Sequence, residues 1–208
     1  MKVKQFNSRV EFSSNVYYVK DDISSFIVDP GFCDDNMINY IKNNGGLDFI
    51  LLTHGHFDHF FGVETLLVHF PKAKVYIHYL DIDLLYDSKK NGLSLFMNKK
   101  IDINFEVNPL FEGENNINNI VFEVIHNPGH TNGSSSFYFK KENLLFVGDF
   151  LFATSIGRCD LFGGSIKLMN KSLEMFKTRK FSDELYVYTG HENNLKYDKL
   201  MKINPYLK

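Results

Sequence analysis

The sequence predicts an α/β or α+β layered domain in which helices cover the outside of β-sheet. Its 208 residues suit a single domain spanning 1–208, long enough to bury about 70% of the surface that the unfolded chain exposes. Apolar residues make up 44% of the chain and charged residues 23%, which is ordinary globular usage. Apolar strand-like runs alternate with amphipathic helical segments in both halves, and this alternation predicts helices layered on sheet.

The first half opens with two predicted strands, Val16–Lys20 and Ser24–Asp29, joined by a tight turn. A helix is expected at 34–44, because Met37, Ile38 and Ile41 share one face and two glycines follow. The next run, Phe49–Leu52, is wholly apolar, which predicts a strand buried on both faces. After it we expect a helix, a strand and a short helix, at Phe60–Phe70, Lys74–His78 and Leu80–Tyr86.

The second half begins with the polar, Asn-rich stretch Lys89–Asn119, where we expect loops with room for one strand. Apolar runs then predict four strands, at Ile120–Ile125, Ser134–Phe139, Leu144–Val147 and Leu185–Tyr188. Helical spacing predicts two helices, at Ser165–Lys177 and Lys196–Lys202.

Composition excludes several functional classes. The formal net charge of −2 disfavours a dedicated nucleic-acid binder. Two cysteines, Cys33 and Cys159, are too few for a disulfide scaffold or a Cys-rich zinc site. Because no long apolar run resembles a signal peptide or a membrane span, we expect a cytoplasmic protein without a membrane partner. The sequence predicts a small-molecule substrate and makes no prediction of oligomeric state.

Four candidate metal ligands lie within six residues: His54, His56, Asp58 and His59. Imidazole and carboxylate groups bind divalent zinc, iron and manganese. Side chains alternate along an extended backbone, so His54, His56 and Asp58 should point one way and His59 another. The loop follows a buried strand, where chemistry is commonly placed, so a solvated loop without a function is a poor alternative. It predicts a metal site that can serve two neighbouring cations.

Three further candidates each follow a predicted strand and a glycine. They occur in Gly129-His130, Gly148-Asp149 and Gly190-His191. Glycine permits tight turns and a close backbone approach. Each residue alone is more typical of a structural role, but the repeated strand–glycine–ligand pattern favours one shared metal site.

The pattern His54-x-His56-x-Asp58-His59, followed by His130, Asp149 and His191, resembles the ligand series of the metallo-β-lactamase superfamily. Within it the chain most resembles the glyoxalase II-like (hydroxyacylglutathione hydrolase-like) hydrolases. That narrower resemblance is carried by three segments: 129–134 (GHTNGS), 148–152 (GDFLF) and 156–161 (IGRCDL).

The resemblance implies a four-layer αββα sandwich and two divalent metal ions, zinc first, with iron or manganese as alternatives. It assigns His54, His56 and His130 to one metal and Asp58, His59 and His191 to the other, with Asp149 bridging both. A metal-bridging hydroxide would then cleave a small thioester, ester or lactone. Asp58 would be the catalytic residue that orients the hydroxide or carries its proton.

The chain departs from the glyoxalase II pattern in three ways. Asn132 stands where proline is frequent, and Glu192 where glycine is usual. It resembles a short form without the C-terminal helical domain that holds glutathione, so glutathione thioesters are doubtful substrates.

Other residues near the pattern have lesser predicted roles. Arg158 and Asp160 could pair and support the ligand loops from outside, or form a plain salt bridge. A turn-forming role is the safer reading of Asp29, although support of the ligand loop is open. Cys159 is not expected to be a nucleophile. Three histidines are expected to be ordinary surface or packing residues, namely His69, His78 and His126.

One alternative function stays open, and three others are disfavoured. The chain also resembles sulfur (persulfide) dioxygenases, which would hold one iron with His54, His130 and Asp149. A catalytically silent binding module on this fold is disfavoured by the complete ligand set. A flavodiiron oxidoreductase is disfavoured because that group has an acid at the position of His56, and a nuclease because the charge is near neutral and no nuclease domain is present.

Overall fold

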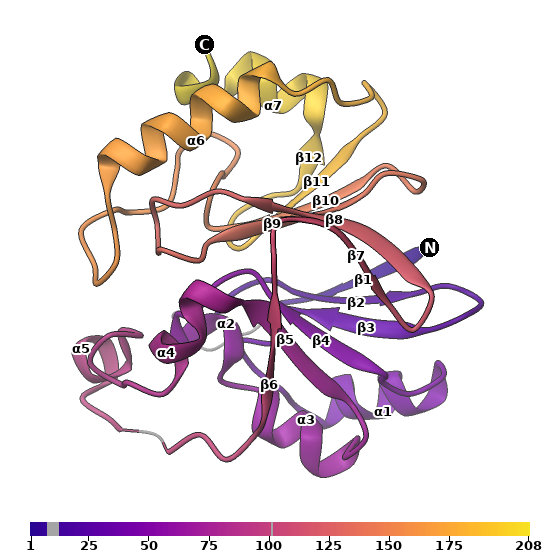
Figure 1. Cartoon of the computed structure of the whole chain (residues 1–208). Coiled ribbons are helices and arrows are strands. Elements are labelled where there is room, and N and C mark those ends of the chain that lie inside the picture. The colour runs from indigo at the N-terminus through magenta and orange to yellow at the C-terminus, as the bar shows by residue number, and fades with distance from the viewer. Residues whose placement is uncertain (8–12, 101) are drawn as a thin grey trace.

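Four layers make up the structure, a computed structural model that describes residues 1–7, 13–100 and 102–208 (Figure 1). Two six-stranded sheets pack face to face, and helices cover the outer face of each. This is the αββα sandwich that the sequence resemblance predicts. The strands follow chain order in both sheets, β1-β2-β3-β4-β5-β6 and β12-β11-β10-β9-β8-β7.

The first sheet and its helices come from the N-terminal half of the chain. Its strands are β1 (Lys2–Phe6), β2 (Val16–Lys20), β3 (Ser25–Val28), β4 (Phe49–Leu52), β5 (Lys74–His78) and β6 (Val107–Leu110). Two helices cover its outer face, α1 (Asp35–Asn43) and α3 (Val63–His69). Shorter helical elements gather toward one end, namely α2 (Phe57–Phe60), η1 (Tyr79–Asp81), α4 (Ile82–Leu85) and α5 (Leu93–Met97).

The second sheet and its helices follow along the chain. Its strands are β7 (Gly113–Ile117), β8 (Ile120–His126), β9 (Ser135–Phe139), β10 (Leu144–Gly148), β11 (Tyr186–Thr189) and β12 (Leu195–Lys196). Its outer face is covered by α6 (Ile166–Thr178) and α7 (Tyr197–Ile203), with a short η2 (Pro205–Leu207) behind them. Among the described residues, no helix combines the length and apolar character needed to cross a membrane.

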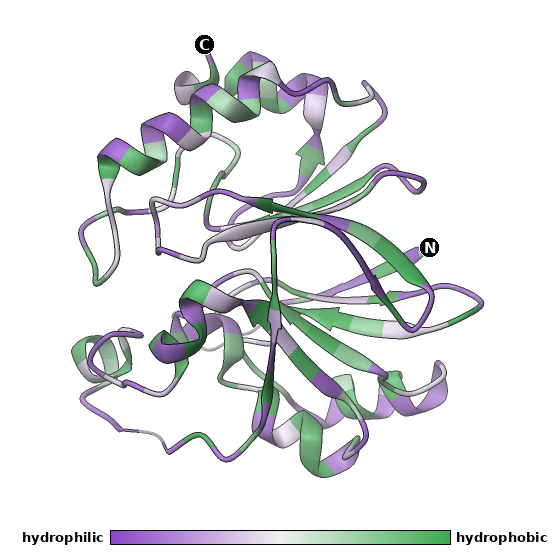
Figure 2. Cartoon of the chain, in the orientation of Figure 1, coloured by the Kyte–Doolittle hydropathy of each residue, from purple (hydrophilic) through white to green (hydrophobic). Residues whose placement is uncertain are grey.

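Alternation along the strands separates the core into layers. On β2, Tyr17 and Val19 pack between the sheets, whereas Val16 and Tyr18 pack against the first helical layer. The strand Phe49–Leu52 is buried on both faces, as its apolar run predicts. Stacked rings fill the centre, with Phe26 placed 4.8 Å from Phe49 and 5.2 Å from Phe139 between centroids. Figure 2 shows these apolar strands facing one another across the middle of the sandwich.

Parallel pairing brings the predicted ligand loops to one end of the sandwich. Strands β3, β4 and β5 are parallel neighbours, so the segments after them, at Asp29, His54 and Asp81, leave the first sheet on the same side. Strands β10 and β11 are also parallel, and they lead to Asp149 and His191. Residues more than a hundred positions apart are placed together by this topology.

Two parts of the secondary structure differ from the sequence prediction. The helix expected at Phe60–Phe70 is present as α3, which begins at Val63 after the separate short helix α2. In the Asn-rich stretch Lys89–Asn119 we expected loops with room for one strand. The structure has two strands there, β6 and β7, and the short helix α5. Strands β1 and β12 were not predicted, since each lies at a sheet edge and carries a weak apolar signal.

Candidate metal centre

Three buried histidines lie close together. His54 and His56 follow β4, and His130 lies in the turn before β9. The ring nitrogen Nε2 of His130 lies 3.2 Å from Nε2 of His54 and 2.8 Å from Nδ1 of His56. A tetrahedral ion with bonds of about 2.0–2.1 Å separates its ligand atoms by roughly 3.3 Å. The three nitrogens therefore have the spacing of ligands to one cation.

The outer nitrogens of two of these rings are held by hydrogen bonds, which fixes their tautomers. Nδ1 of His130 donates to the backbone carbonyl of Arg158 over 2.7 Å. The Thr53 hydroxyl donates to the Asp29 carboxylate, so its oxygen is left to accept from Nδ1 of His54. In both rings the inner Nε2 then carries a bare lone pair.

A second group lies beside the first. Nε2 of His191 is 3.2 Å from Oδ2 of Asp58, and Nε2 of His59 is 3.7 Å from the same oxygen. His59 is fully buried, and its Nδ1 donates to Asp29 over 2.9 Å, so its Nε2 points inward. Asp58, His59 and His191 thus present one carboxylate and two imidazoles to a common point.

Asp149 lies between the two groups. Its Oδ1 is 3.3 Å from Nε2 of His59, while its Oδ2 is 3.5 Å from Nε2 of His130 and 3.7 Å from Nε2 of His191. One carboxylate therefore faces histidines of both groups.

The charges of the histidines divide in the same way. Burial, reinforced by neighbouring histidines, lowers the pKa of His54 well below its ordinary value and that of His56 to about 3. Burial alone would also lower the pKa of His59, but Asp149 and other carboxylates raise it well above its ordinary value. His54 and His56 are therefore uncharged at neutral pH, whereas the carboxylates around His59 favour a positive charge there.

The residues fit a pair of divalent cations. Bare lone pairs of His54 and His130 face each other, which is repulsive unless a cation lies between them. Nε2 of His59 and Oδ1 of Asp149 are buried without a hydrogen-bond partner. All seven predicted ligand residues lie in this one cluster, although their role as ligands stays a prediction.

One detail of the sequence argument was wrong. Asp58 does not share the direction of His54 and His56, because the extended backbone ends at His56 and α2 begins at Phe57. The helical turn places Asp58 and His59 together in the second group. The prediction that this loop serves two neighbouring sites agrees with that division.

Glycines allow the close approach of the ligand loops. A Cβ on Gly190 would lie 2.1 Å from Oδ1 of Asp149 and 2.8 Å from Cε1 of His59. Gly148 adopts φ +51, and a Cβ there would lie 2.2 Å from Oγ1 of Thr53. No larger residue fits either position without displacing a predicted ligand or its support. Glu192, by contrast, holds φ +64, a conformation that favours the glycine usual at this position.

Asp29 has a larger role than the turn formation expected from sequence. Its side chain accepts hydrogen bonds from the Thr53 backbone N–H, the Thr53 hydroxyl and His59 Nδ1. It therefore orients His54 through Thr53 and orients His59 directly. The backbone also turns here, with φ +51 at Asp29 and its carbonyl accepting from the Gly31 N–H, so both roles that the sequence left open agree with the structure.

Asp81 was missed by the sequence analysis. It is 1% exposed, and it accepts from Gly55 N–H over 3.0 Å, from Gly133 N–H over 2.6 Å and from the Thr131 hydroxyl over 2.6 Å. These donors belong to the two loops that carry the first histidine group. The signal that could have found Asp81 is its position just after a buried strand, which the predicted ligands share.

Arg158 and Asp160 pair as the sequence suggested. Arg158 Nε and Nη2 donate to the two Asp160 oxygens over 2.7 and 2.8 Å, and both side chains are at least half exposed. It is the Arg158 backbone carbonyl that orients His130, so support by the paired side chains stays a prediction. Cys159 bonds only to Gly157 O among the described contacts, and burial raises its pKa, which suits the prediction that it is not a nucleophile.

The three remaining histidines lie outside the cluster. His69 is exposed at the end of α3. His78 and His126 stack on each other with centroids 4.3 Å apart, joining the end of β5 to the end of β8. They are packing residues, as expected.

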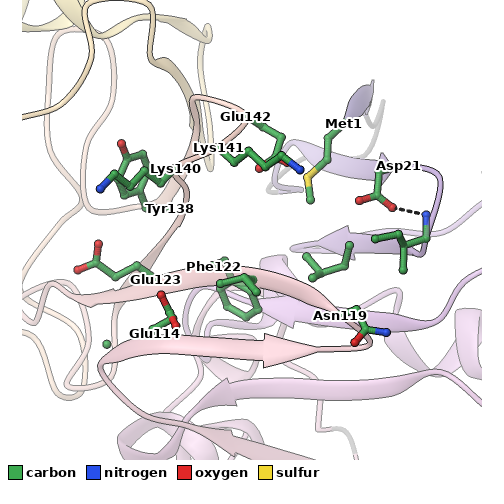
Figure 3. A pocket seen from close by; sticks show the side chains of 14 residues that line it. Met1, Asp21, Glu114, Asn119, Phe122, Glu123, Tyr138, Lys140, Lys141 and Glu142 are labelled. Carbon is green, nitrogen blue, oxygen red and sulfur yellow. Dashed lines mark hydrogen bonds between the residues drawn. The ribbon is translucent and has the colours of Figure 1, made fainter.

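A cavity of about 370 Å³ opens over the metal-ligand cluster. It is lined by predicted ligands from both groups and by Phe57, Phe96, Phe152, Leu161 and Arg158. A larger cavity, of about 870 Å³, lies between the β7–β8 hairpin, the β2–β3 turn and the β9–β10 turn. Figure 3 shows its lining of Met1, Phe122 and Tyr138 with mixed charges. None of the described residues that line it is a histidine or cysteine, so the smaller cavity is the candidate active site.

Comparison with known proteins gives a family. The family model described as "Metallo-beta-lactamase superfamily" matches residues 9–191. A probable metallo-hydrolase, YqgX of Bacillus subtilis, is 32% identical over 86% of this chain and 84% of its own length. A hydroxyacylglutathione hydrolase of Aeromonas hydrophila is 32% identical over 88% of this chain. The alignment spans only 63% of that relative.

Solved structures agree with the sequence relatives. The BLEG-1 B3 metallo-beta-lactamase superposes with a TM-score of 0.90 at 34% identity, with full coverage of both chains. TTHA1623 in a di-iron-bound form superposes with a TM-score of 0.84 at 29% identity, again with full coverage of both chains.

Proposed function

Because this chain belongs to the metallo-β-lactamase superfamily, we propose that it is a dinuclear metal-dependent hydrolase that cleaves a small thioester, ester or lactone. The observation that carries the proposal is the convergence of seven imidazole and carboxylate side chains, among which Nε2 of His59 and Oδ1 of Asp149 are buried without a hydrogen-bond partner. Its similarity to a protein solved with two irons supports the number of metals, and its similarity to a hydroxyacylglutathione hydrolase supports the type of bond.

The residues present would divide between two ions. His54, His56 and His130 would hold the first ion, and Asp58, His59 and His191 the second. Asp149 would bridge them, since its carboxylate faces histidines of both groups.

Bound divalent cations would supply a water of lowered pKa and polarise the substrate carbonyl. The chain's own part is orientation and proton handling. Asp58 has a pKa below its ordinary value, because His59 and His191 outweigh the effect of burial, so at neutral pH it is an ionised acceptor. It lines the cavity, where it can orient an attacking water and take its proton.

A mononuclear iron dioxygenase acting on persulfides is the second candidate. His130 faces both His54 and Asp149 within 3.5 Å, so the two-histidine, one-carboxylate set of such a centre is present. The complete second group favours the dinuclear hydrolase over it.

Metal content of protein purified without added metal or chelator tests the proposal. We expect about two divalent ions per chain by elemental mass spectrometry, most simply zinc, and about one after His191→Ala. The protein with two ions should hydrolyse thioesters or lactones. One iron per chain with oxygen uptake on a persulfide would replace this proposal with the second candidate.

A further inference from the structure

Beyond the metal-ligand cluster, most of the wall of the candidate active-site cavity is apolar. Phe57, Phe96, Phe152 and Leu161 form it, and Asn91, Gly157 and Arg158 complete the lining. Phe152 begins it, with its ring centroid 6.0 Å from that of His191. Phe57 and Phe96 continue it from the first half of the chain, with centroids 6.2 Å apart, and Leu161 closes it from the second half. The wall therefore runs from the reaction centre to the surface, where Phe96 is 37% exposed.

The charge at the mouth of this cavity is neutralised. Arg158 is the one lysine or arginine among the described residues that line it. Two of its guanidinium nitrogens donate to the Asp160 carboxylate, and its Cζ lies 5.7 Å from the Phe96 ring centroid. The guanidinium thus lies over the Phe96 ring and has its carboxylate partner already in place.

We propose that this cavity selects substrates whose acyl group is apolar, an aliphatic chain of about four to six carbons or a phenyl ring, and whose leaving group is uncharged. The inference rests on the proposed hydrolase function and adds its substrate class. Burial of apolar surface is worth about fourfold in binding for each methylene. A glutathione leaving group, with its two carboxylates, meets no unpaired cation among the described lining residues.

A series of thioesters of the neutral thiol N-acetylcysteamine tests the inference. The acyl groups are acetyl, butyryl, hexanoyl and phenylacetyl, and S-lactoylglutathione is the charged comparison. We expect kcat/KM to rise about fourfold for each added methylene until the wall is covered. The hexanoyl and phenylacetyl substrates should then exceed S-lactoylglutathione by at least tenfold.

Two variants locate the effect on the wall. In Phe96→Ala and in Phe152→Ala, the ratio of kcat/KM for the hexanoyl substrate to that for the acetyl substrate should fall at least fivefold. Metal content should stay at the wild-type value. Phe111→Ala is the matched control, because Phe111 is 57% exposed and lies outside the cavity lining. Its chain-length dependence should match that of the wild type.

A binding measurement on metal-free protein gives a readout independent of turnover. Fluorine NMR of the neutral ligand 4-fluorophenylacetamide should show line broadening with wild-type protein and little with Phe152→Ala. No broadening, or hydrolysis that ignores chain length or prefers S-lactoylglutathione, overturns the inference and leaves the proposed hydrolase standing. Absence of hydrolysis for every substrate overturns the proposed function instead, and the NMR result then decides the inference.

Discussion

At the scale of single residues, two buried aspartates hold the candidate metal ligands without being ligands themselves. Asp29 orients His54 and His59 within the loop after β4. Asp81 joins that loop to the loop of His130 through Gly55, Thr131 and Gly133. Such outer hydrogen bonds commonly change metal affinity 10–100-fold when they are removed.

Asp81→Asn should weaken metal binding by roughly 10–100-fold. The amide NH₂ must replace one carboxylate oxygen, so it faces the N–H of either Gly55 or Gly133 and one hydrogen bond is lost. Affinity is measured by competition with a chromophoric chelator. Activity should recover at saturating metal, a rescue that general unfolding would not show.

Asp83→Asn is the control for Asp81→Asn, because Asp83 lies two residues along and is exposed, and the charge change is identical. Its metal affinity should equal that of the wild type. Equal affinities for wild type and Asp81→Asn would contradict the positioning role.

At the scale of elements, α6 supports the loop of His130. Ser165 caps the helix by accepting from Leu168 N–H, and the Ser165 N–H donates to the Gly129 carbonyl. Gly129 holds φ +147, and a Cβ there would lie 2.5 Å from the Met169 backbone. The first turn of α6 therefore sets the position of the backbone just before His130.

Gly129→Ala should destabilise the fold by about 1–3 kcal/mol from overpacking, added to about 1 kcal/mol of backbone strain, and should reduce metal occupancy. Gly113→Ala is the matched control, since Gly113 also has a positive φ, +103, but no atom within 4 Å of an added Cβ. Chemical denaturation compares the two. If Gly129→Ala and Gly113→Ala lost the same unfolding free energy, the close contact between Gly129 and α6 would not contribute to stability and the prediction would be contradicted.

At the scale of the whole molecule, the candidate metal centre joins the two halves of the sandwich. Four predicted ligands come from the first half, and His130, Asp149 and His191 come from the second. Ligands that bind only the native state stabilise it by mass action.

Chelation should lower Tm by roughly 10 °C, since about 4 kcal/mol of binding free energy is lost at a thousandfold excess over Kd. Differential scanning calorimetry with and without chelator measures the change. The double variant His54→Ala, His191→Ala should show no such shift. An unchanged wild-type Tm after both ions are removed would contradict the linkage between the halves.

The stacked pair His78 and His126 gives the fold a pH dependence. Burial, with His126 adding to it, lowers the pKa of His78 to about 4. The unfolded chain therefore binds a proton more readily than the fold, so stability is complete above about pH 6.5 and falls toward pH 4. Between pH 7 and pH 5 the unfolding free energy of His78→Gln should therefore fall by roughly 1–2 kcal/mol less than that of the wild type. Urea denaturation at the two pH values measures the difference. If the unfolding free energies of the wild type and His78→Gln changed equally with pH, the assignment of this pH dependence to His78 would be contradicted.

Much of the fold could be predicted from local pattern. The buried strand Phe49–Leu52, the cap of α1 at Asp34 and the cap of α6 at Ser165 each depend on neighbours in the chain, which the sequence displays directly. The edge strands β1 and β12 could not be predicted, because their pairing with a neighbouring strand stabilises them more than their own residues do.

The sequence by itself determined the seven candidate ligands, because four of them cluster after one buried strand, the other three repeat a strand–glycine–ligand pattern, and together they resemble a known ligand series. The family resemblance implied how they divide, and only the tertiary structure gave the physical reason, because the helical turn at α2 sends Asp58 toward His191, 133 residues away. The tertiary structure also decided the roles of Asp29 and Asp81 and the apolar wall. Those roles depend on distances between loops of different strands, which parallel pairing sets and no local pattern records.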